Sequence, residues 1–222
     1  MIAAGVAAAA LICIDPGHGT PPAIGAQTEP IGPGSSVRKI KDGGGAHGEA
    51  AVALAISKRM RKLLLARGYR VAMTRTGPTI HLGDGNGNIA RAKFCNRRHA
   101  ALMVRIHADG STDRSLHGIS TLVPAWHSGW TDDIYRPSLG AGRDVQKALV
   151  SSTGALNRGI VRRSDLTGFN WANVPAILVE TGFLSNANDW KLLHTPSYQQ
   201  RVARGLANGV STFVGLPRRA ST

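Results

Sequence analysis

Two histidines and two glutamates, far apart along the chain, carry the chemistry of a hydrolytic metal site. They are His18, Glu49, His107 and Glu180. Two neutral imidazoles and one carboxylate, with a fourth position open to water, form a known kind of hydrolytic zinc site. We therefore assign His18, Glu49 and His107 as ligands of one Zn²⁺ ion. Zinc is preferred because the set contains no thiolate and because hydrolysis needs no redox chemistry.

Zinc-assisted hydrolysis also requires a base that takes a proton from the attacking water and returns it to the leaving amine. Glu180 follows an apolar run, a setting that can raise its pKa, and we assign this role to it. The chain has only three glutamates, so each is a candidate for a specific task. Glu29, in a loop rich in proline and glycine, is expected to have none. The alternative explanation of Glu49 is that its carboxylate only stabilises the first turn of a helix.

The other histidines are weaker candidates. His47 precedes Glu49 by two residues, so it is a rival or accessory ligand. The remaining histidines lie in segments expected to be loops or polar helix ends, where solvated side chains are common.

The metal-site residues are expected at one edge of a sheet. The apolar run from Leu11 to Ile14 predicts a buried strand, which Pro16-Gly17 must end just before His18. A second strand, 101–109, ends with the other predicted histidine ligand, and a third, 175–183, carries the predicted base. Because ligands bind beyond the carboxyl ends of strands in open α/β sheets, these side chains can meet there.

The other elements alternate in the same way. We expect strands at 69–75 and 118–124, and helices at 48–66, 89–100, 139–156 and 197–213. Segments 20–48, 126–137 and 157–174 are expected to be largely irregular. This order predicts a single-domain α/β fold with a mixed, mostly parallel twisted sheet flanked by helices on both faces. We expect one catalytic domain over residues 1–222, with 1–10 a signal remnant or strand extension and 215–222 a frayed tail.

Composition restricts the partners. The chain has 27 Lys plus Arg against 13 Asp plus Glu, a formal net charge of +14, which favours polyanions or an acidic cell envelope. Because no basic motif interleaved with aromatic residues is present, we expect no nucleic acid. No segment is long and apolar enough to cross a bilayer. The two cysteines, Cys13 and Cys95, are expected to be buried free thiols, although a single bridge is possible.

Several motifs occur in an order that resembles the zinc-dependent N-acetylmuramoyl-L-alanine amidases of the type-3 amidase family. The similarity covers nearly the whole chain, from about Leu11 to Phe213. It rests on Ile14-Asp15-Pro16-Gly17-His18-Gly19, Glu49 before an amphipathic helix, Gly68-Tyr69-Arg70-Val71, Thr74-Arg75, Arg91, Ile106-His107-Ala108-Asp109 and Leu178-Val179-Glu180-Thr181-Gly182-Phe183-Leu184-Ser185-Asn186.

The resemblance implies hydrolysis of the amide between N-acetylmuramic acid and L-alanine in peptidoglycan. It places zinc on His18, Glu49 and His107, and the catalytic carboxylate on Glu180, in agreement with the assignment from the residues. The long Pro- and Gly-rich loop after His18, Ala50 after Glu49, and Arg105 and Asp109 around the second histidine depart from the family pattern. These departures concern the groove and the preference for the peptide rather than the ligands.

Four further residues are candidates for the site. Arg75 and Arg91 could hold a carboxylate of the stem peptide by bidentate pairing, or could form structural salt bridges. Asn170 could line the substrate groove. Asp15 could orient a ligand histidine or cap a turn.

Two alternative functions remain open at this point. One is a zinc exopeptidase or amidohydrolase acting on free peptides; the other is a non-catalytic, basic wall-binding module. We expect a monomeric hydrolase that degrades cell wall outside the cytoplasm, in the periplasm or wall as an autolysin, or as a phage endolysin delivered to the wall. The basic surface would retain it there, so activity on whole walls should fall with added salt.

Overall fold

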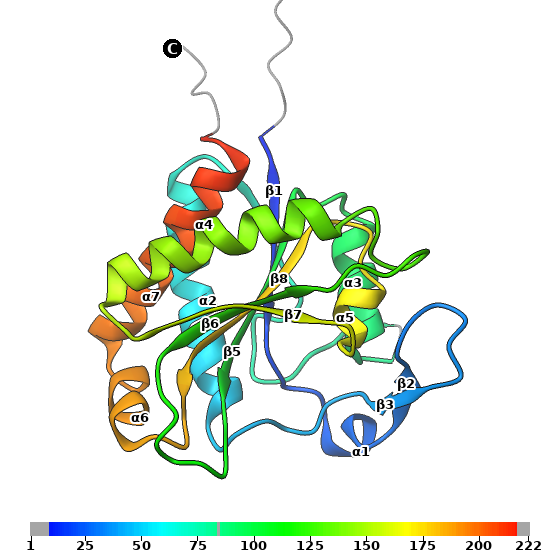
Figure 1. Ribbon diagram of the computed structural model, residues 1–222, viewed down its shortest axis with the longest axis horizontal. Helices are drawn as coiled ribbons and strands as arrows, with labels where there is room; N and C mark the ends of the chain where they lie inside the picture. The colour runs from blue at the N-terminus through cyan, green and yellow to red at the C-terminus, as the bar shows by residue number, and fades with distance from the viewer. Residues whose placement is uncertain (1–8, 84, 217–222) are drawn as a thin grey trace, which may run out of the picture.

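Six strands form the main sheet. The computed structural model describes residues 9–83 and 85–216. The strands are β1 (Leu11–Pro16), β4 (Arg70–Met73), β5 (Leu102–Asp109), β6 (Ile119–Pro124), β7 (Asn157–Arg163) and β8 (Ala176–Phe183). Their order in the sheet is β4-β1-β5-β8-β6-β7 (Figure 1). All neighbours are parallel except β6 and β8. The expected mixed, mostly parallel sheet is confirmed.

Helices cover both faces of this sheet, as predicted. The larger hydrophobic cluster joins one face to α2 (Glu49–Ala66), α4 (Tyr135–Thr153) and α7 (Pro196–Val214). A smaller cluster on the other face includes residues of α3 (Asn88–Asn96) and α5 (Thr167–Asn170). Alternation along β1 separates the clusters, because Ile12 and Ile14 belong to the first and Cys13 to the second.

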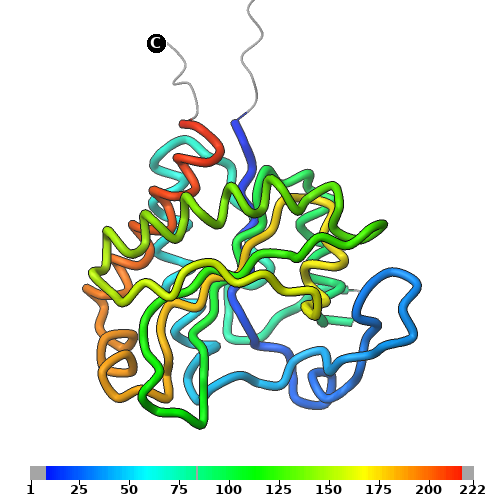
Figure 2. The backbone as a smooth tube through the Cα atoms, viewed as in Figure 1, coloured from blue at the N-terminus to red at the C-terminus, as the bar shows by residue number. Residues whose placement is uncertain are grey.

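The carboxyl ends of β1, β5 and β8 lie at the same edge of the sheet. Parallel pairing places His107 beside Glu180 in the register of β5 and β8. Figure 2 shows the loops at this edge on the side of the molecule opposite the two described ends of the chain. The topology thus gathers the predicted site residues at one edge.

Several segments expected to be irregular contain regular structure. Residues 20–48 contain α1 (Pro22–Gly25) and a hairpin of β2 (Thr28–Pro30) and β3 (Arg38–Ile40). Residues 157–174 contain β7 and α5, and α6 (Ala187–Leu193) was not predicted at all. The charged sequence of β7 does not predict a strand. β7 can carry charged side chains because it is an edge strand, paired only with β6, and stays largely open to solvent. Tertiary pairing therefore overrides local pattern here.

Glu29 has a structural task, so its predicted lack of one is wrong. Its side chain is buried and accepts the N–H groups of Asn88 (2.8 Å) and Ile89 (3.2 Å). These are the first two residues of α3, whose N–H groups have no partner within the helix. A carboxylate from the β2–β3 hairpin therefore caps α3.

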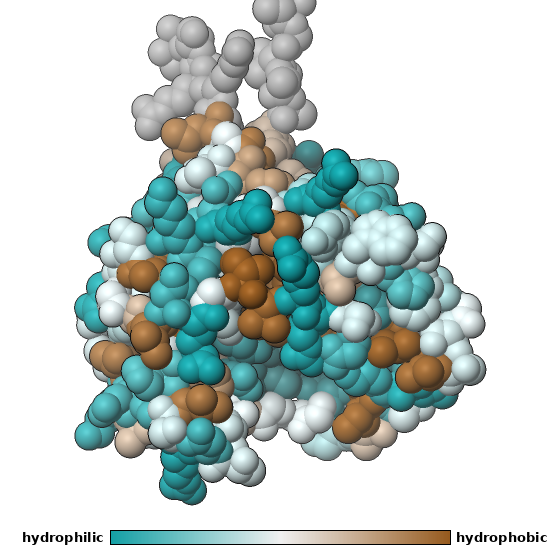
Figure 3. All heavy atoms as spheres, viewed as in Figure 1, coloured by the Kyte–Doolittle hydropathy of each residue, from teal (hydrophilic) through white to brown (hydrophobic). Residues whose placement is uncertain are grey.

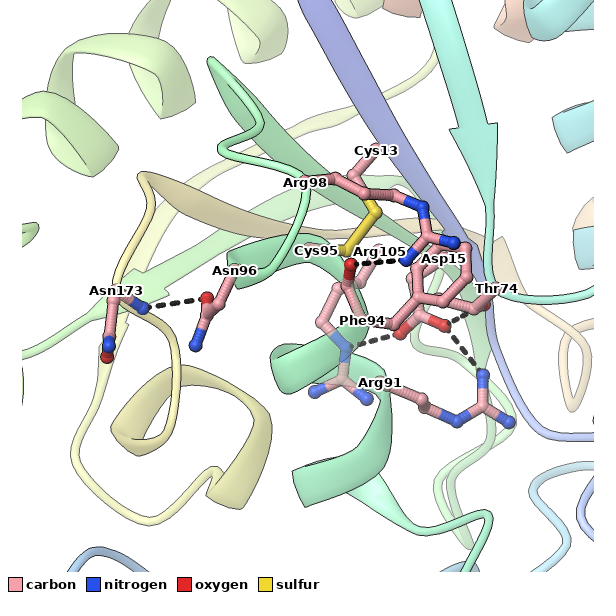
Figure 4. The surroundings of a disulfide bond; sticks show 10 residues. All are labelled: Cys13, Asp15, Thr74, Arg91, Phe94, Cys95, Asn96, Arg98, Arg105 and Asn173. Atoms are coloured by element: carbon pink, nitrogen blue, oxygen red, sulfur yellow. Dashed lines mark hydrogen bonds and ion pairs between the residues drawn. A yellow bond between two sulfur atoms is a disulfide. The ribbon is translucent and has the colours of Figure 1, made fainter. Parts of the chain in front are cut away.

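The prediction of two free thiols is also wrong, because Cys13 and Cys95 form a disulfide between β1 and α3 (Figure 4). Their Cα atoms are 5.7 Å apart, although the residues are 82 positions apart in sequence. Packing of α3 against the face of β1 that carries Cys13 brings the thiols together. The sequence could not choose between the two states, because burial alone suits either.

Replacing both cysteines by alanine is expected to lower the free energy of unfolding by about 2–5 kcal/mol, because the bridge closes a long loop of the unfolded chain. Urea unfolding of the wild type with and without a reductant, compared with the double variant, measures this. The reductant should destabilise the wild type and leave the double variant unchanged. Equal unfolding midpoints for oxidised wild type and the double variant would contradict the expectation.

The predicted signal remnant and frayed tail fall mostly outside the described residues. Within them, Ala9 and Ala10 precede β1, where the carbonyl of Ala10 accepts the N–H of Arg70 in β4 at 3.0 Å, and Gly215 and Leu216 follow α7. None of the helices over residues 9–83 and 85–216 combines the length and apolarity needed to span a membrane.

Candidate metal centre and active site

An open pocket of about 520 Å³ lies at the carboxyl edge of the sheet. Its lining includes all four residues singled out for metal-assisted hydrolysis: His18, Glu49, His107 and Glu180. Ligand atoms of the first three lie within 4.8 Å of one another. Within the part of the chain that the structure describes, this is the one group of three or more side chains of metal-ligating type at such distances.

His18 lies in a turn that two buried arginines hold in place. The residue has φ +59°, which is uncommon for a side chain other than glycine. Arg91 donates to the carbonyl of His18 (2.6 Å) and to that of Pro16 (2.9 Å). Arg75 donates to the carbonyls of Gly17 (2.6 Å) and Pro16 (3.2 Å). These bonds oppose the strain of the turn and fix the direction of the imidazole.

This geometry favours the structural role of the two arginines over contact with substrate. Both residues are only 3% exposed, and their guanidinium groups bond carbonyls or buried carboxylate. A stem-peptide carboxylate could reach them only by displacing those bonds. Burial, followed by the neighbouring charge of Arg91, lowers the pKa of Arg75 to about 10.

Glu49 opens α2 and joins the two histidines. Its Oε1 lies 2.9 Å from Nε2 of His18 and 2.9 Å from Nδ1 of His107. Its Oε2 accepts the N–H of Ala46 at 2.9 Å. Burial opposes ionisation, but hydrogen bonds from both histidines outweigh it and hold the pKa of Glu49 well below its usual range. The carboxylate is therefore ionised, as a metal ligand must be.

The two histidines differ in electrostatic environment. Burial lowers the pKa of His18, but hydrogen bonds with Asp42 and Glu49 outweigh this effect and raise it to about 9. Burial dominates at His107 and lowers its pKa, because the contact with Glu49 only partly compensates. His107 packs against Gly17, where a Cβ would overlap the imidazole ring. A larger residue at this turn position would displace the histidine.

Glu180 is the buried acid of the pocket. Its Oε2 and Nε2 of His107 are two of the three buried side-chain polar atoms without a hydrogen-bond partner in the described part of the chain. Burial, with the charges of Asp109 and Glu49, raises the pKa of Glu180 well above its usual value. An unpartnered carboxyl with a raised pKa is typical of a general acid or base rather than of a structural ion pair.

The residues present fit a metal ion. The donor set is two imidazoles and one ionised carboxylate, which suits zinc. Gly45 leaves room beside them, because a Cβ there would overlap Oε2 of Glu49 and Nε2 of His18. The absence of a side chain at Gly45 thus keeps two ligand atoms open to a bound ion.

Gly45→Ala is therefore expected to weaken zinc binding at least about 10-fold, since small displacements of ligands and their supports have effects of this size. Competition with a colorimetric chelator measures the affinity. Gly44→Ala is a matched control for backbone strain, because Gly44 has φ +82° but no atom near its added Cβ. Gly43→Ala is the second control, because at Gly43 an added Cβ meets neither a neighbouring atom nor a strained backbone conformation. Equal affinity of the Gly45 and Gly44 variants would contradict the steric argument.

Three other sequence candidates do not join the pocket. Asn170 is 2% exposed and donates to the carbonyls of Ile31 and Ser164, so it fixes loops instead of lining a groove. Within the described ranges, the carboxylate of Asp15 bonds Thr74, Arg91 and Arg105 and no histidine, so the prediction that it orients a ligand is corrected. His47 is exposed and lies outside the cluster of ligand atoms.

Asp15 instead forms a buried ionic cluster beneath the site. Its carboxylate accepts from Thr74 (2.5 Å), Arg91 (2.7 Å) and Arg105 (2.9 Å) (Figure 4). It therefore neutralises two buried arginines, one of which also holds the turn of His18. Its contribution to the site is indirect.

Two acidic residues near the site were missed from the sequence. Asp109 lines the pocket, and burial raises its pKa. Asp42 contacts Nδ1 of His18 at 2.6 Å. The only sequence signal for Asp42 was an acidic residue next to the basic residues Arg38, Lys39 and Lys41, and that pattern does not say where the loop folds.

A six-stranded α/β sheet with two histidines, a glutamate and a second, buried glutamate at its carboxyl edge defines a hydrolase-type site that can hold a metal ion. Residues 12–212 match the family described as N-acetylmuramoyl-L-alanine amidase, and the chain belongs to that family. The enzyme therefore hydrolyses the amide between N-acetylmuramic acid and L-alanine of peptidoglycan. This result favours amidase activity over the alternatives of a free-peptide hydrolase and a non-catalytic module.

Individual relatives agree with this assignment. The chain is 29% identical over 234 residues to the N-acetylmuramoyl-L-alanine amidase of Mycobacterium tuberculosis, covering 95% of this chain and 88% of the relative. It is 26% identical to the amidase AmiA of Salmonella typhimurium, covering 91% and 75%. The crystal structure of the amidase Ami1 from Mycobacterium smegmatis superimposes with a TM-score of 0.82 at 28% identity, covering 94% and 98%.

Proposed function

We propose that this amidase uses one Zn²⁺ ion held by His18, Glu49 and His107, with Glu180 as general base and acid. The observation that carries the proposal is the convergence of three ligand atoms within 4.8 Å beside a buried, unpartnered carboxyl. Thiolate does not compete as a ligand, because both cysteines are in the disulfide.

The proposed roles follow from what each side chain can do. Bound zinc would supply a Lewis acid that acidifies water and polarises the scissile carbonyl. Glu180 takes a proton from water while the oxygen of that water attacks the carbonyl carbon. It then gives the proton to the nitrogen of L-alanine as the C–N bond breaks. Its raised pKa suits both directions of transfer, and its free Oε2 gives it a position from which to act.

Metal removal tests this proposal. We expect the purified enzyme to contain one zinc per chain, and to release stem peptides with an N-terminal L-alanine from purified peptidoglycan. Chelation should abolish release, and stoichiometric zinc should restore it. Free stem peptides serve as a second substrate and should stay uncut. A metal-free preparation that still releases peptides, measured by mass spectrometry, would overturn the zinc assignment.

We further propose that the enzyme works as a monomer outside the cytoplasm, as an autolysin in the periplasm or wall or as a phage endolysin. Polar side chains cover most of the face in Figure 3, interrupted by separate small hydrophobic patches. The formal charge of +14 suits retention on an anionic wall. We expect added salt to lower activity on whole walls while activity on soluble muropeptides changes little. Equal salt dependence on both substrates would contradict wall retention.

A further inference from the structure

A carboxylate from the segment between β3 and α2 lies against the predicted zinc ligand His18. Oδ1 of Asp42 is 2.6 Å from Nδ1 of His18, and the Asp42 side chain is only 6% exposed. The residues are 24 positions apart, so the fold makes this contact rather than local chain geometry. Asp42 therefore contacts Nδ1 of His18, whereas Glu49 faces the other ring nitrogen, Nε2.

The Asp42 carboxylate is itself held in one position. Its Oδ1 accepts the N–H of Gly44 at 2.9 Å, and its Oδ2 accepts the N–H of Thr20 at 3.2 Å. Its own N–H donates to the carbonyl of Gly25, at the end of α1, at 3.1 Å. Hydrogen bonds with Thr20, Gly25 and Gly44 thus fix both carboxylate oxygens and the main chain of Asp42.

This arrangement has a chemical consequence for His18. An imidazole that donates from Nδ1 to a carboxylate presents the lone pair of Nε2 to a metal ion. Nε2 of His18 lies 2.9 Å from Oε1 of Glu49, on the side where the ligand atoms converge. We propose that Asp42 is a positioning residue, which fixes the orientation and tautomer of His18 for zinc. The inference rests on the zinc site proposed above.

Among the residues that the structure describes, Asp42 is the acidic side chain that contacts Nδ1 of His18. Asp15, the candidate suggested by the sequence, is committed to Thr74 and two arginines. Glu49 faces Nε2. The long loop after His18 therefore has a specific task, because it brings Asp42 back to the ligand.

The test compares zinc affinity in four variants by competition with a chelator. Asp42→Ala is expected to weaken binding about 10–100-fold, the usual effect of losing a carboxylate behind a ligand histidine. Asp42→Asn keeps an acceptor oxygen of the same size and should recover part of the loss. Gly25→Ala should also weaken binding, because its added Cβ would lie 2.7 Å from the carbonyl oxygen of Asp42. Asp133→Asn, an exposed aspartate, should leave the affinity unchanged.

The visible spectrum of the Co²⁺-loaded protein gives a second readout, which loss of stability alone would not move. We expect it to change in Asp42→Ala and not in Asp133→Asn. If wild type binds zinc and both Asp42 variants bind it equally well with the wild-type cobalt spectrum, the positioning role is wrong while the zinc site stands. If wild type binds no zinc, both proposals fail. Should the alanine variant not fold, unaltered affinity in the asparagine and Gly25 variants overturns the proposal.

Discussion

Glu180→Gln is expected to lower the turnover of purified peptidoglycan about 10²–10⁴-fold, the usual contribution of a positioned general acid or base. Glutamine keeps the size of the side chain but can neither take nor return a proton. The zinc content should match that of wild type, because Glu180 is not in the ligand cluster. Release of stem peptides and metal analysis on the same preparation measure both quantities.

Glu29→Gln is the matched control, because Glu29 is also a buried glutamate but caps α3 away from the pocket. It should keep wild-type turnover. In wild type, hydrolysis needs ionised Glu180, so activity should fall as pH decreases through its raised pKa. A Glu180→Gln variant with turnover near wild type would exclude the proton-transfer role. Loss of zinc in that variant would instead assign Glu180 to the ligand set.

Asp15→Asn is expected to destabilise the protein by about 3–5 kcal/mol, the cost of removing one partner from a buried ionic cluster. Asp15 is fully buried between Arg91 and Arg105, and its loss leaves both guanidinium groups without their neutralising charge. The urea midpoint of unfolding at neutral pH measures the change. Asp165→Asn, which breaks half-exposed pairs with Lys39 and Arg163, should cost less than about 1 kcal/mol.

The same cluster predicts the direction of acid unfolding. Burial opposes ionisation of Asp15, but the charges of Arg91 and Arg105 and the Thr74 hydrogen bond outweigh it, so its pKa lies well below the ordinary value. Its folded-state pKa is depressed, so the stabilisation is fully present above the unfolded-state pKa of about 4. It is lost as pH falls below that value. Asp15→Asn should therefore show a weaker loss of stability between about pH 5 and pH 2 than wild type. An equal loss would contradict this contribution.

Much of the fold was readable from the sequence because its signals are local. An apolar run stopped by Pro16-Gly17 predicts the end of β1 just before His18, and Gly68 follows the end of α2 close to its predicted boundary. The helix predicted to begin at 139 begins earlier, at Tyr135, which shows the limit of such signals. Neighbouring residues encode where elements begin and end to within a few positions.

The sequence by itself determined the order of most of the main strands and helices, β7 excepted, because strand ends and helical periodicity are visible along the chain. It also indicated the candidates His18, Glu49, His107 and Glu180, since they lie at predicted element ends and glutamate is scarce. Only the tertiary structure decided that Cys13 pairs with Cys95, that Arg75 and Arg91 hold a turn, and that Asp42 rather than Asp15 contacts His18. Those contacts join segments 24 to 82 positions apart. Which buried polar group meets which partner depends on packing in three dimensions, and residue type alone does not encode it.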